Sequence, residues 1–424
     1  MELKPGYKQT DAGVIPEEWG VRPMSDLVVE FRGGAALKPS DFTRTGVKIL
    51  PKGGVGRTGW LRIEDIDLQY CAASYAAAHR NNQVDQSYTI VVLRDLVPSG
   101  PSIGLMVQIK DAEAYVLAQG VYGFKLNEKA DSRYLIQLSN TRWYRQLMNS
   151  IMVGSTQVHI TNSGFRQARV PIPPLPEQRA IAAALSDVDA LLTKLDQLLS
   201  KKHDLKQAAM QRLLTGRTRL PGFSGEWITR RVADFSAFVT KGATPTTYGF
   251  KWQENGVVFL RSECVAANGL DLGQSMFISQ EAHSVLIRGE VRSGDILITI
   301  TGNVGRVVLL ADEFDFANIN QHIARIRVRD PEVSAGFVFH WLSQRGIREH
   351  FLSITTGQAY PQISLKQVRE TIIPIPSLQE QAAIATALSD MDAELVALES
   401  RRDKTRALKQ GMMQELLTGR IRLV

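Results

Sequence analysis

The chain has 424 residues, of which 44% are hydrophobic and 22% charged, as expected for a well-packed soluble protein. This length exceeds what one ordinary core supports, so we expect at least two domains. The sequence has no long apolar run and its N-terminus is polar, so we expect neither a membrane span nor a secretion signal. Cys71 and Cys264 are isolated from each other, which argues against a disulfide framework and favours a cytoplasmic location.

The net charge of +7 and the pI near 9.3 agree with a polyanionic partner such as a nucleic acid. Many soluble proteins share this balance, so charge alone is a weak indication. The excess is not gathered in a terminal tail, so any nucleic-acid surface is expected to lie on folded domains.

The N-terminal segment, 1–20, is a polar, turn-rich lead that runs into Glu18-Trp19-Gly20-Val21-Arg22. The next segment, 21–170, begins with a basic glycine loop at 32–35 and contains short β-branched runs, such as 88–93, that predict strands. One helix is predicted near 134–152, and a polar loop follows at 154–160. We interpret this segment as a domain of mixed α/β type.

The third segment, 171–220, reads as one long helix. Prolines crowd its start and Gly216 follows its last turn, as is typical of helix ends. Apolar residues recur at coiled-coil spacing, at Leu185, Val188, Leu192 and Leu195. Some 38 residues of helix correspond to a rod roughly 57 Å long.

The fourth segment, 221–373, repeats the lead and the mixed domain. Its lead contains Glu226-Trp227-Ile228-Thr229-Arg230, and a basic glycine loop follows at 241–245. Strands are predicted at 291–300, interrupted by a turn at 293–295, and at 306–310. One helix is predicted near 337–353, followed by a polar loop at 357–363.

The fifth segment, 374–424, repeats the long helix at a constant offset of 203, with 30 identities over fifty positions. Because the two helices share their length, phase and charged interruption, we expect them to pack on each other as an antiparallel coiled coil. The alternative is two amphipathic helices, each packed on its own domain. The predicted fold class is therefore α+β, with two mixed domains separated by two long helices and a pseudo-twofold internal repeat whose termini lie close together.

No catalytic constellation is evident. The sequence Gly302-Asn303-Val304-Gly305 lacks the lysine of a phosphate-binding loop and is interpreted as a hairpin turn. The Asn/Asp-Pro-Pro-aromatic tetrapeptide of an amino-methyltransferase is missing, and the seven histidines show no metal-ligand spacing. We therefore expect a non-catalytic chain with no metal or cofactor of its own.

Side chains suited to DNA recognition occur in both mixed domains. Arginine and lysine recognise guanine or phosphate, and asparagine and glutamine recognise adenine. The candidates in the first domain are Arg32, Lys38, Lys52, Arg57, Arg62, Gln119, Thr156 and Gln157. Those in the second are Lys241, Thr244, Lys251, Arg261, Asn303, Asn320, Gln321, Gln358 and Tyr360. Any one of them is equally well explained as a solvated surface residue, but as sets of loops they favour contact with DNA.

These motifs resemble the specificity subunits of Type I restriction–modification systems over essentially the whole chain. The repeated Pro-Ile-Pro-x-Leu-x-Glu-Gln, followed by a helix ending in Leu-Leu-Thr-Gly-Arg, is similar to that family's conserved regions. The lead at 4–19 and the segments 293–298 and 320–322 also match the family's pattern. The corresponding parts of the first domain, 93–96 and 119–121, depart from it.

The resemblance implies that segments 21–170 and 228–373 are target-recognition domains, each reading one half of a split site in double-stranded DNA. It also implies two methyltransferase subunits that use S-adenosylmethionine, and restriction subunits, dependent on ATP and Mg²⁺, that bind through them. The repeated helix starts are the expected docking residues: Pro173, Leu175, Glu177, Gln178, Pro376, Leu378, Glu380 and Gln381.

Two other classes of function stay open. A scaffold that binds only proteins would show no salt-dependent affinity for DNA. An enzyme with an unrecognised site would modify DNA without partner subunits, given its cofactor.

Overall fold

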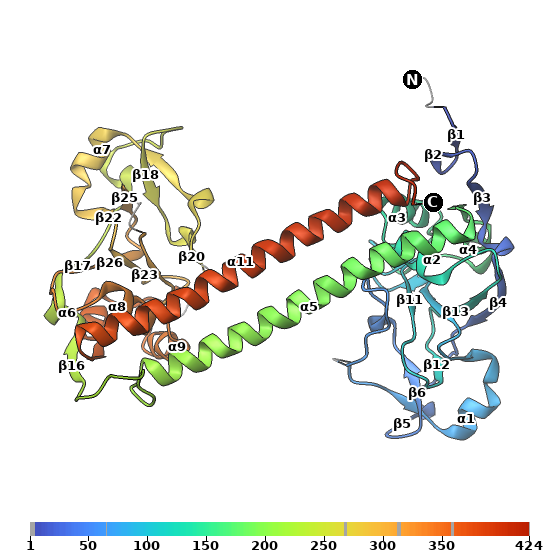
Figure 1. Ribbon diagram of the computed structural model, residues 1–424, viewed down its shortest axis with the longest axis horizontal. Coiled ribbons are helices and arrows are strands. Elements are labelled where there is room, and N and C mark those ends of the chain that lie inside the picture. The colour runs from blue at the N-terminus through green and yellow to red at the C-terminus, as the bar shows by residue number, and fades with distance from the viewer. Residues whose placement is uncertain (1–4, 65, 267–268, 312–314, 358–359, 424) are drawn as a thin grey trace. The chain divides into compact units, whose positions relative to one another are not determined.

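The computed structural model describes residues 5–64, 66–266, 269–311, 315–357 and 360–423 (Figure 1). Two compact units are present: unit 1 comprises Met1–Asp196 with Arg401–Val424, and unit 2 comprises Gln197–Ser400. Each unit holds one mixed domain together with half of each long helix. We call residues 21–170 the first head and residues 228–373 the second head. The predicted α+β fold class, with two mixed domains and two long helices, is confirmed.

Each head begins and ends in neighbouring strands. In unit 1 the lead forms a hairpin of β1 (Tyr7–Thr10) and β2 (Gly13–Pro16). Strand β3 (Gly20–Pro23) then pairs antiparallel with β15 (Arg169–Ile172), which leads into the first long helix. In unit 2, β16 (Ile228–Arg231) pairs in the same way with β27 (Ile372–Ile375). The chain therefore enters and leaves each head at one place.

The first head contains two sheets. The central sheet is antiparallel, in the order β11 (Met106–Gln108), β9 (Thr89–Val92), β13 (Val121–Leu126) and β4 (Val28–Gly33). The second sheet has the order β5 (Phe42–Thr43), β7 (Tyr70–Cys71), β6 (Val47–Leu50), β12 (Tyr115–Leu117) and β8 (Gln83–Val84). The strand predicted at 88–93 is confirmed as β9, which is fully buried because its apolar residues face both neighbouring layers.

The second head repeats this plan. Its central sheet has the order β17 (Ser236–Lys241), β26 (Ile323–Val328), β23 (Ile296–Thr299) and β24 (Val307–Leu309). Its other sheet has the order β21 (Met276–Ile278), β18 (Val257–Leu260), β25 (Phe316–Ile319) and β22 (Glu290–Arg292). The residues 302–305 lie between the antiparallel strands β23 and β24, which confirms the predicted hairpin turn.

The helix predicted as one element in each head is two helices. The first head has α2 (Ser132–Ser139) and α3 (Arg142–Ser150), and the second has α8 (Ala335–Leu342) and α9 (Arg345–Ser353). Thr141 interrupts the first pair with an extended backbone, and its hydroxyl accepts a hydrogen bond from the Tyr144 amide. A capping side chain at this position starts a new helix, which the apolar periodicity did not reveal.

The long helices are α5 (Leu175–Leu213) and α11 (Leu378–Leu416), each of 39 residues. In unit 1, Lys409 of α11 forms an ion pair with Asp189 of α5 at 2.7 Å. In unit 2, Lys202 of α5 forms an ion pair with Glu394 of α11 at 2.6 Å. These pairs show that the helices run antiparallel beside each other within each unit, so the coiled-coil prediction is confirmed.

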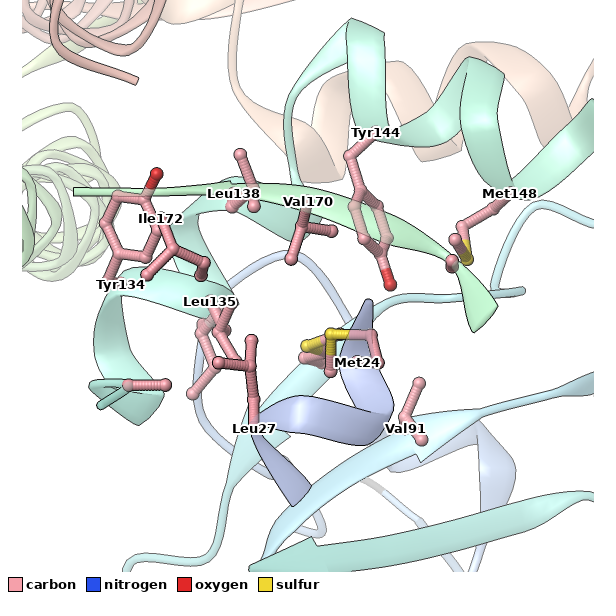
Figure 2. Close-up of a cluster of buried hydrophobic side chains, with 14 of the residues drawn as sticks. Met24, Leu27, Val91, Tyr134, Leu135, Leu138, Tyr144, Met148, Val170 and Ile172 are labelled. Atoms are coloured by element: carbon pink, nitrogen blue, oxygen red, sulfur yellow. The ribbon is translucent and has the colours of Figure 1, made fainter. Parts of the chain in front are cut away.

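A continuous apolar core joins each head to its part of the helix pair. In unit 1 this core contains Met24 and Leu27 from the start of the head, Tyr134 from α2 and Ile172 from β15 (Figure 2). The same cluster includes Leu185 of α5 and Leu416 of α11. In unit 2 the cluster likewise runs from β23 and β26 through α8 to both long helices. The head and the helix ends of one unit are thus a single folding body.

Candidate nucleic-acid interface

Three segments of the first head meet at the end of its central sheet. Their backbones are joined by hydrogen bonds: the Leu93 amide donates to the Gly120 carbonyl at 2.9 Å, and the Ile160 amide donates to the Leu93 carbonyl at 2.8 Å. Strand β10 (Arg94–Asp95) pairs there with β14 (Val158–His159). We call these segments, residues 93–104, 118–120 and 153–160, the first loop cluster.

The second head builds the same backbone frame. The Ile300 amide donates to the His322 carbonyl and the Ile363 amide donates to the Ile300 carbonyl, each at 2.9 Å. Thr301 forms an isolated bridge with Gln362, at the position where Arg94 of β10 pairs with His159 of β14 in the first head. Residues 300–305, 320–322, 356–357 and 360–363 are the second loop cluster.

The glycine loop of each head passes directly against its loop cluster. A Cβ atom on Gly34 would lie 1.9 Å from the Ala118 carbonyl oxygen, and one on Gly242 would lie 1.6 Å from the Ile319 carbonyl oxygen. Only glycine allows the two backbones to approach so closely. The sequence-predicted glycine loops are therefore positioned beside the loops that carry the polar candidates.

Asp95 anchors the first loop cluster from inside. Its carboxylate is buried and accepts hydrogen bonds from the Ser102 hydroxyl at 2.5 Å, the Leu96 amide at 2.8 Å and the Lys52 ammonium at 2.9 Å. Burial opposes its ionisation, but the hydrogen bonds from Ser102 and Lys52 outweigh burial and hold the pKa of Asp95 well below its usual range. The loop from 95 to 102 is thus fixed by a buried anion.

Two cations predicted to contact DNA have structural partners. Lys52 is half-buried against Asp95. Arg32 is half-buried, forms an ion pair with Glu30 at 2.5 Å and donates to the Gln83 carbonyl at 2.7 Å. The guanidinium group of Arg32 and the ammonium group of Lys52 hold segments of the head together, and their contact with DNA stays a prediction.

The other candidates of the first head are exposed. Gln119, Thr156 and Gln157 lie in the first loop cluster. Lys38 lies on the segment after the glycine loop, and Arg57 and Arg62 lie on the segment after β6. The structure therefore gathers three of the predicted residues and leaves the three cations outside the cluster.

In the second head, Thr244 and Gln321 come together. The Thr244 hydroxyl donates to the Gln321 side-chain oxygen at 2.5 Å, and the Gln321 amide group lies 3.0 Å from the His322 ring. Tyr360 is 76% exposed in the same cluster, and Asn303 is exposed at the tip of the β23–β24 hairpin. These four candidates form one polar surface.

Four further candidates do not join this surface. Asn320 is only 7% exposed and its side-chain oxygen accepts from the His322 amide, so it stabilises the turn and the prediction is corrected. The Arg261 guanidinium donates to the Gln274 carbonyl at 2.9 Å, which also indicates a structural role. Lys241 and Lys251 are exposed outside the cluster, and Gln358 lies outside the described residues.

Sequence reasoning missed Arg94, which lies in the first loop cluster and donates to Gln157 at 2.7 Å. The available signal was local: a charged Arg-Asp pair directly follows the apolar run that forms β9. Such a change from apolar to charged residues at a strand end marks the point where the chain leaves the core.

The glutamine residues predicted to dock a partner are buried and bonded within the chain. The Gln178 side chain accepts from the Asp131 amide at 2.8 Å and donates to the Lys129 carbonyl at 2.9 Å. Gln381 repeats both contacts, accepting from the Ser334 amide at 2.8 Å and donating to the Glu332 carbonyl at 2.9 Å. Each glutamine thereby ties the start of a long helix to the start of a head helix.

The neighbouring glutamates are buried as well. Glu177 binds Arg422 at 2.5 Å and accepts from the Trp19 indole at 2.9 Å. Glu380 binds Arg219, with the closer distance 2.5 Å. We call Glu177, Gln178, Glu380 and Gln381 with these partners the helix clamps. Because Arg422 and Trp19 lie near opposite ends of the sequence, their contacts with Glu177 confirm that the terminal segments lie close together.

These clamps correct the docking prediction. Pro173 and Pro376 are buried like the glutamates and glutamines, so these six side chains hold the chain together rather than face a partner. Leu175 is half-buried and Leu378 is exposed, and only for these two does the docking prediction stay as made.

Over the described residues, no group of three or more His, Cys, Asp or Glu side chains is placed to hold a metal ion. No helix in the described part of the chain is long and apolar enough to cross a membrane.

Comparison with known proteins gives a consistent match. The family model of the Type I restriction modification DNA specificity domain matches residues 16–202 and 224–406. The Escherichia coli EcoBI specificity subunit is 24% identical, with 95% of this chain and 85% of that protein covered. The Methanocaldococcus jannaschii MjaVIII specificity subunit is also 24% identical, covering 98% and 96%. Among solved structures, the S subunit of a Type I restriction–modification system from M. genitalium superposes with a TM-score of 0.62 at 15% identity, covering 98% of this chain and 99% of that one.

Proposed function

The chain belongs to the family of Type I restriction–modification specificity subunits, and from this premise we propose that its two heads each read one half of a bipartite DNA target. The chain itself carries out no catalysis in this proposal. S-adenosylmethionine, ATP and Mg²⁺ are used by methyltransferase and restriction subunits assembled on it.

One observation carries the proposal: the two loop clusters share a backbone frame but present different polar side chains. The first cluster presents Arg94, Gln119 and Gln157, and the second presents Thr301, Gln321 and Tyr360. Sequence readout in the major groove depends on the donors and acceptors that reach base edges. Two such sets in one chain fit two unlike half-sites, whereas two identical chains would fit a palindrome.

The test is selection from a randomised duplex pool by the chain together with its methyltransferase partner, followed by sequencing of the retained DNA. Two short, unlike motifs at a fixed gap are the expected result. Retention without an enriched motif would contradict sequence reading and favour a scaffold. Methylation or cleavage by the purified chain alone, given S-adenosylmethionine or Mg²⁺, would contradict the non-catalytic role.

The long helices are proposed to set the gap between half-sites. At 39 residues each, α5 and α11 are about 58 Å long, enough to serve sites separated by one or more turns of the duplex. Inserting one heptad into each helix at matched positions keeps the apolar seam in phase. We expect the selected gap to change and both motifs to persist. An unchanged gap would overturn this role of the helices.

Docking of two methyltransferase subunits is proposed for the ends of the long helices. Four exposed residues of this region are identical in the two repeats: Leu205, Gln207, Gln211 and Arg217 in unit 2 correspond to Leu408, Gln410, Gln414 and Arg420 in unit 1. In unit 1, Gln410, Gln414 and Arg420 line a cavity of about 800 Å³, which Trp143 also lines. Two copies of one exposed surface fit two copies of one ligand.

The docking test pairs Gln414→Arg in unit 1 with Gln211→Arg in unit 2. Each single change should remove one methyltransferase subunit from the complex, and the double change should remove both, measured by native mass spectrometry. Thr193→Arg, at an exposed position of α5 that the repeat does not preserve, is the control. Full stoichiometry in the double variant would contradict this surface.

A further inference from the structure

The first loop cluster holds the half-buried Arg94 in a constrained position. Arg94 opens β10, and its backbone pairs with His159 across the cluster. A Cβ atom on Gly120, whose φ is +88°, would lie 2.8 Å from the Arg94 Cβ atom, so glycine at 120 lets the turn lie directly against residue 94. The base of the side chain is therefore enclosed on one side by the 118–120 turn.

The segment that follows Arg94 is fixed from within the head. Asp95 is the buried anion described above, and it binds Ser102 and Lys52. The Arg145 guanidinium of α3 donates to the carbonyls of Gly100 and Pro101 at 3.1 Å each, and to that of Ile103. Ordering of this loop is thus complete before any ligand binds, which lowers the entropic cost of binding.

The tip of Arg94 is oriented by a residue far away in the sequence. Its Nη2 atom donates to the Gln157 side-chain oxygen at 2.7 Å, across the cluster and at the exposed surface. No carboxylate in the described residues forms an ion pair with Arg94. A guanidinium has five N–H donors, so this bond leaves a pair of donors for a ligand.

A guanidinium fork of this kind matches the O6 and N7 acceptors of guanine in the major groove. The second head provides a contrast on the same frame. The position of Arg94 is occupied there by Thr301, and that of Gln157 by Tyr360, as the shared bridges to Gln362 and His159 show. The side chains at these two positions thus differ between the heads, whereas the helix clamps recur in both.

We propose that Arg94 reads a guanine in the half-site of the first head, and that Gln157 is the positioning residue that orients its guanidinium. This inference rests on the proposed function, because it assigns a base to one of the two readers. The second head, with Thr301 and Tyr360 at these positions, reads its half-site by other contacts.

The experiment uses the complete chain with its methyltransferase partner. The wild-type target is first obtained by selection from the randomised pool, which tests the proposed function separately. Binding is then measured for Arg94→Ala and Gln157→Ala on the selected duplex and on duplexes with each guanine of the half-sites replaced in turn. Arg133→Ala, at an exposed position of α2 outside the cluster, is the control.

We expect Arg94→Ala to abolish discrimination at one guanine of one half-site, by roughly ten- to a hundredfold. The other half-site should keep its preferences. Replacing that guanine by 7-deazaguanine, which lacks the N7 acceptor, should weaken wild-type binding but not binding by Arg94→Ala. Gln157→Ala should reduce discrimination at the same guanine by a smaller factor, and adding it to Arg94→Ala should cause no further loss.

Three results would overturn the inference. Retention of every guanine preference by Arg94→Ala would show that it reads none. Uniform weakening on all duplexes, with the motif unchanged, would show a contact with the phosphate backbone or a purely structural role. An additive effect of the two substitutions would show that Gln157 acts independently of Arg94. If the wild-type complex enriches no bipartite motif, the proposed function fails before this question arises.

Discussion

The two heads place a guanidinium in the same space between their sheets but supply it from neighbouring strands. In the first head it is Arg32 of β4, opposite Gly123 of β13, and it binds the Gln83 carbonyl. In the second it is Arg325 of β26, opposite Thr240 of β17, and it binds the Arg288 carbonyl at 3.2 Å. Arg32 thereby ties the central sheet to the first residue of β8, and Arg325 ties it to the short turn before β22. Both heads thus have such a tie, and a different strand supplies it in each.

The helix clamps show the opposite behaviour. Glu177 and Gln178 recur as Glu380 and Gln381 at the same repeat offset, with the same type of partner. A head can therefore vary inside while its attachment to the helices does not. The two repeats therefore share the contacts that attach each head to the long helices, whereas residues inside the heads differ between them.

Removing a clamp glutamate tests the attachment of a head to the long helices, and of all the changes considered it should lower the free energy of unfolding most. In Glu177→Ala, Trp19 and Arg422 lose a fully buried partner, and we expect the free energy of unfolding of unit 1 to fall by about 3 kcal/mol. Hydrogen exchange of amides in the two units measures this. Glu17→Ala, an exposed carboxylate of the same lead, should have little effect. Equal loss of protection in both units would contradict a local clamp.

The pH dependence of stability is expected to differ between the two units, because a buried histidine lies where the second head packs against the long helices. His340 is buried, with its Nε2 atom 3.0 Å from the Ser389 hydroxyl, and the first head has Gln137 at the equivalent position. Burial, together with the nearby Lys206 and despite the nearby Asp392, lowers the pKa of His340 to about 4. An unfolded histidine titrates near pH 6.5.

Between those two pH values only the unfolded chain binds the extra proton. Stability therefore falls as the pH drops from about 6.5 towards 4, and the histidine accounts for about 3 kcal/mol of that fall. His340→Gln, which installs the residue of the first repeat, should remove this component from urea unfolding curves of unit 2. Identical pH slopes for the variant and the wild type would show that the imidazole is not kept neutral.

The exchanged arginine can be tested by moving it between strands. A side chain at Gly123 would place its Cβ atom 2.5 Å from a Val84 methyl group, so Gly123→Arg alone should cost about 2 kcal/mol through overpacking. In the background of Arg32→Thr, which copies the second head, the cost should be smaller because the competing guanidinium is gone. A double-mutant cycle measures the coupling. Strict additivity would mean that the two arginines do not occupy one space.

The smallest effect is expected at the indole groups of the two leads. The Trp19 indole N–H donates to Glu177, whereas that of Trp227 is buried and has no hydrogen-bond partner among the residues that the structure describes. We expect Trp19→Phe to cost about 1 kcal/mol and Trp227→Phe to cost less than about half of that. Thermal unfolding of the two variants measures the contrast. A larger loss for Trp227→Phe would show that the second lead relies on this indole more than its hydrogen bonds indicate.

The sequence predicted features that depend on local pattern or on the repeat. The long helices, the strand β9 and the hairpin at 302–305 follow from periodicity and turn residues close together in the chain. The break between α2 and α3 did not follow, because Thr141 lies within an otherwise continuous helical pattern. The hydroxyl group of this one threonine caps the start of α3.

Individual site residues were harder to predict because their roles depend on distant partners. Lys52 looks like a phosphate ligand until the fold brings Asp95 to it, and Asn320 looks like an adenine reader until it caps its own turn. Arg94 was overlooked for the converse reason, since its significance depends on Gln157, which lies in another loop. Charge and residue type pointed to loops that the fold brings together, but only the tertiary contacts showed which of their side chains have structural partners.

The pairing of β3 with β15, and of β16 with β27, has a genetic consequence. Each head is inserted through two adjacent strands, so its coding segment can be exchanged by crossovers in the sequences that flank it. The exchanged head can then form the same strand pairing and the same contacts with the buried glutamate and glutamine of the long helix. If the heads read DNA as proposed, a single recombination event would change the recognition sequence without any compensating change in the rest of the gene.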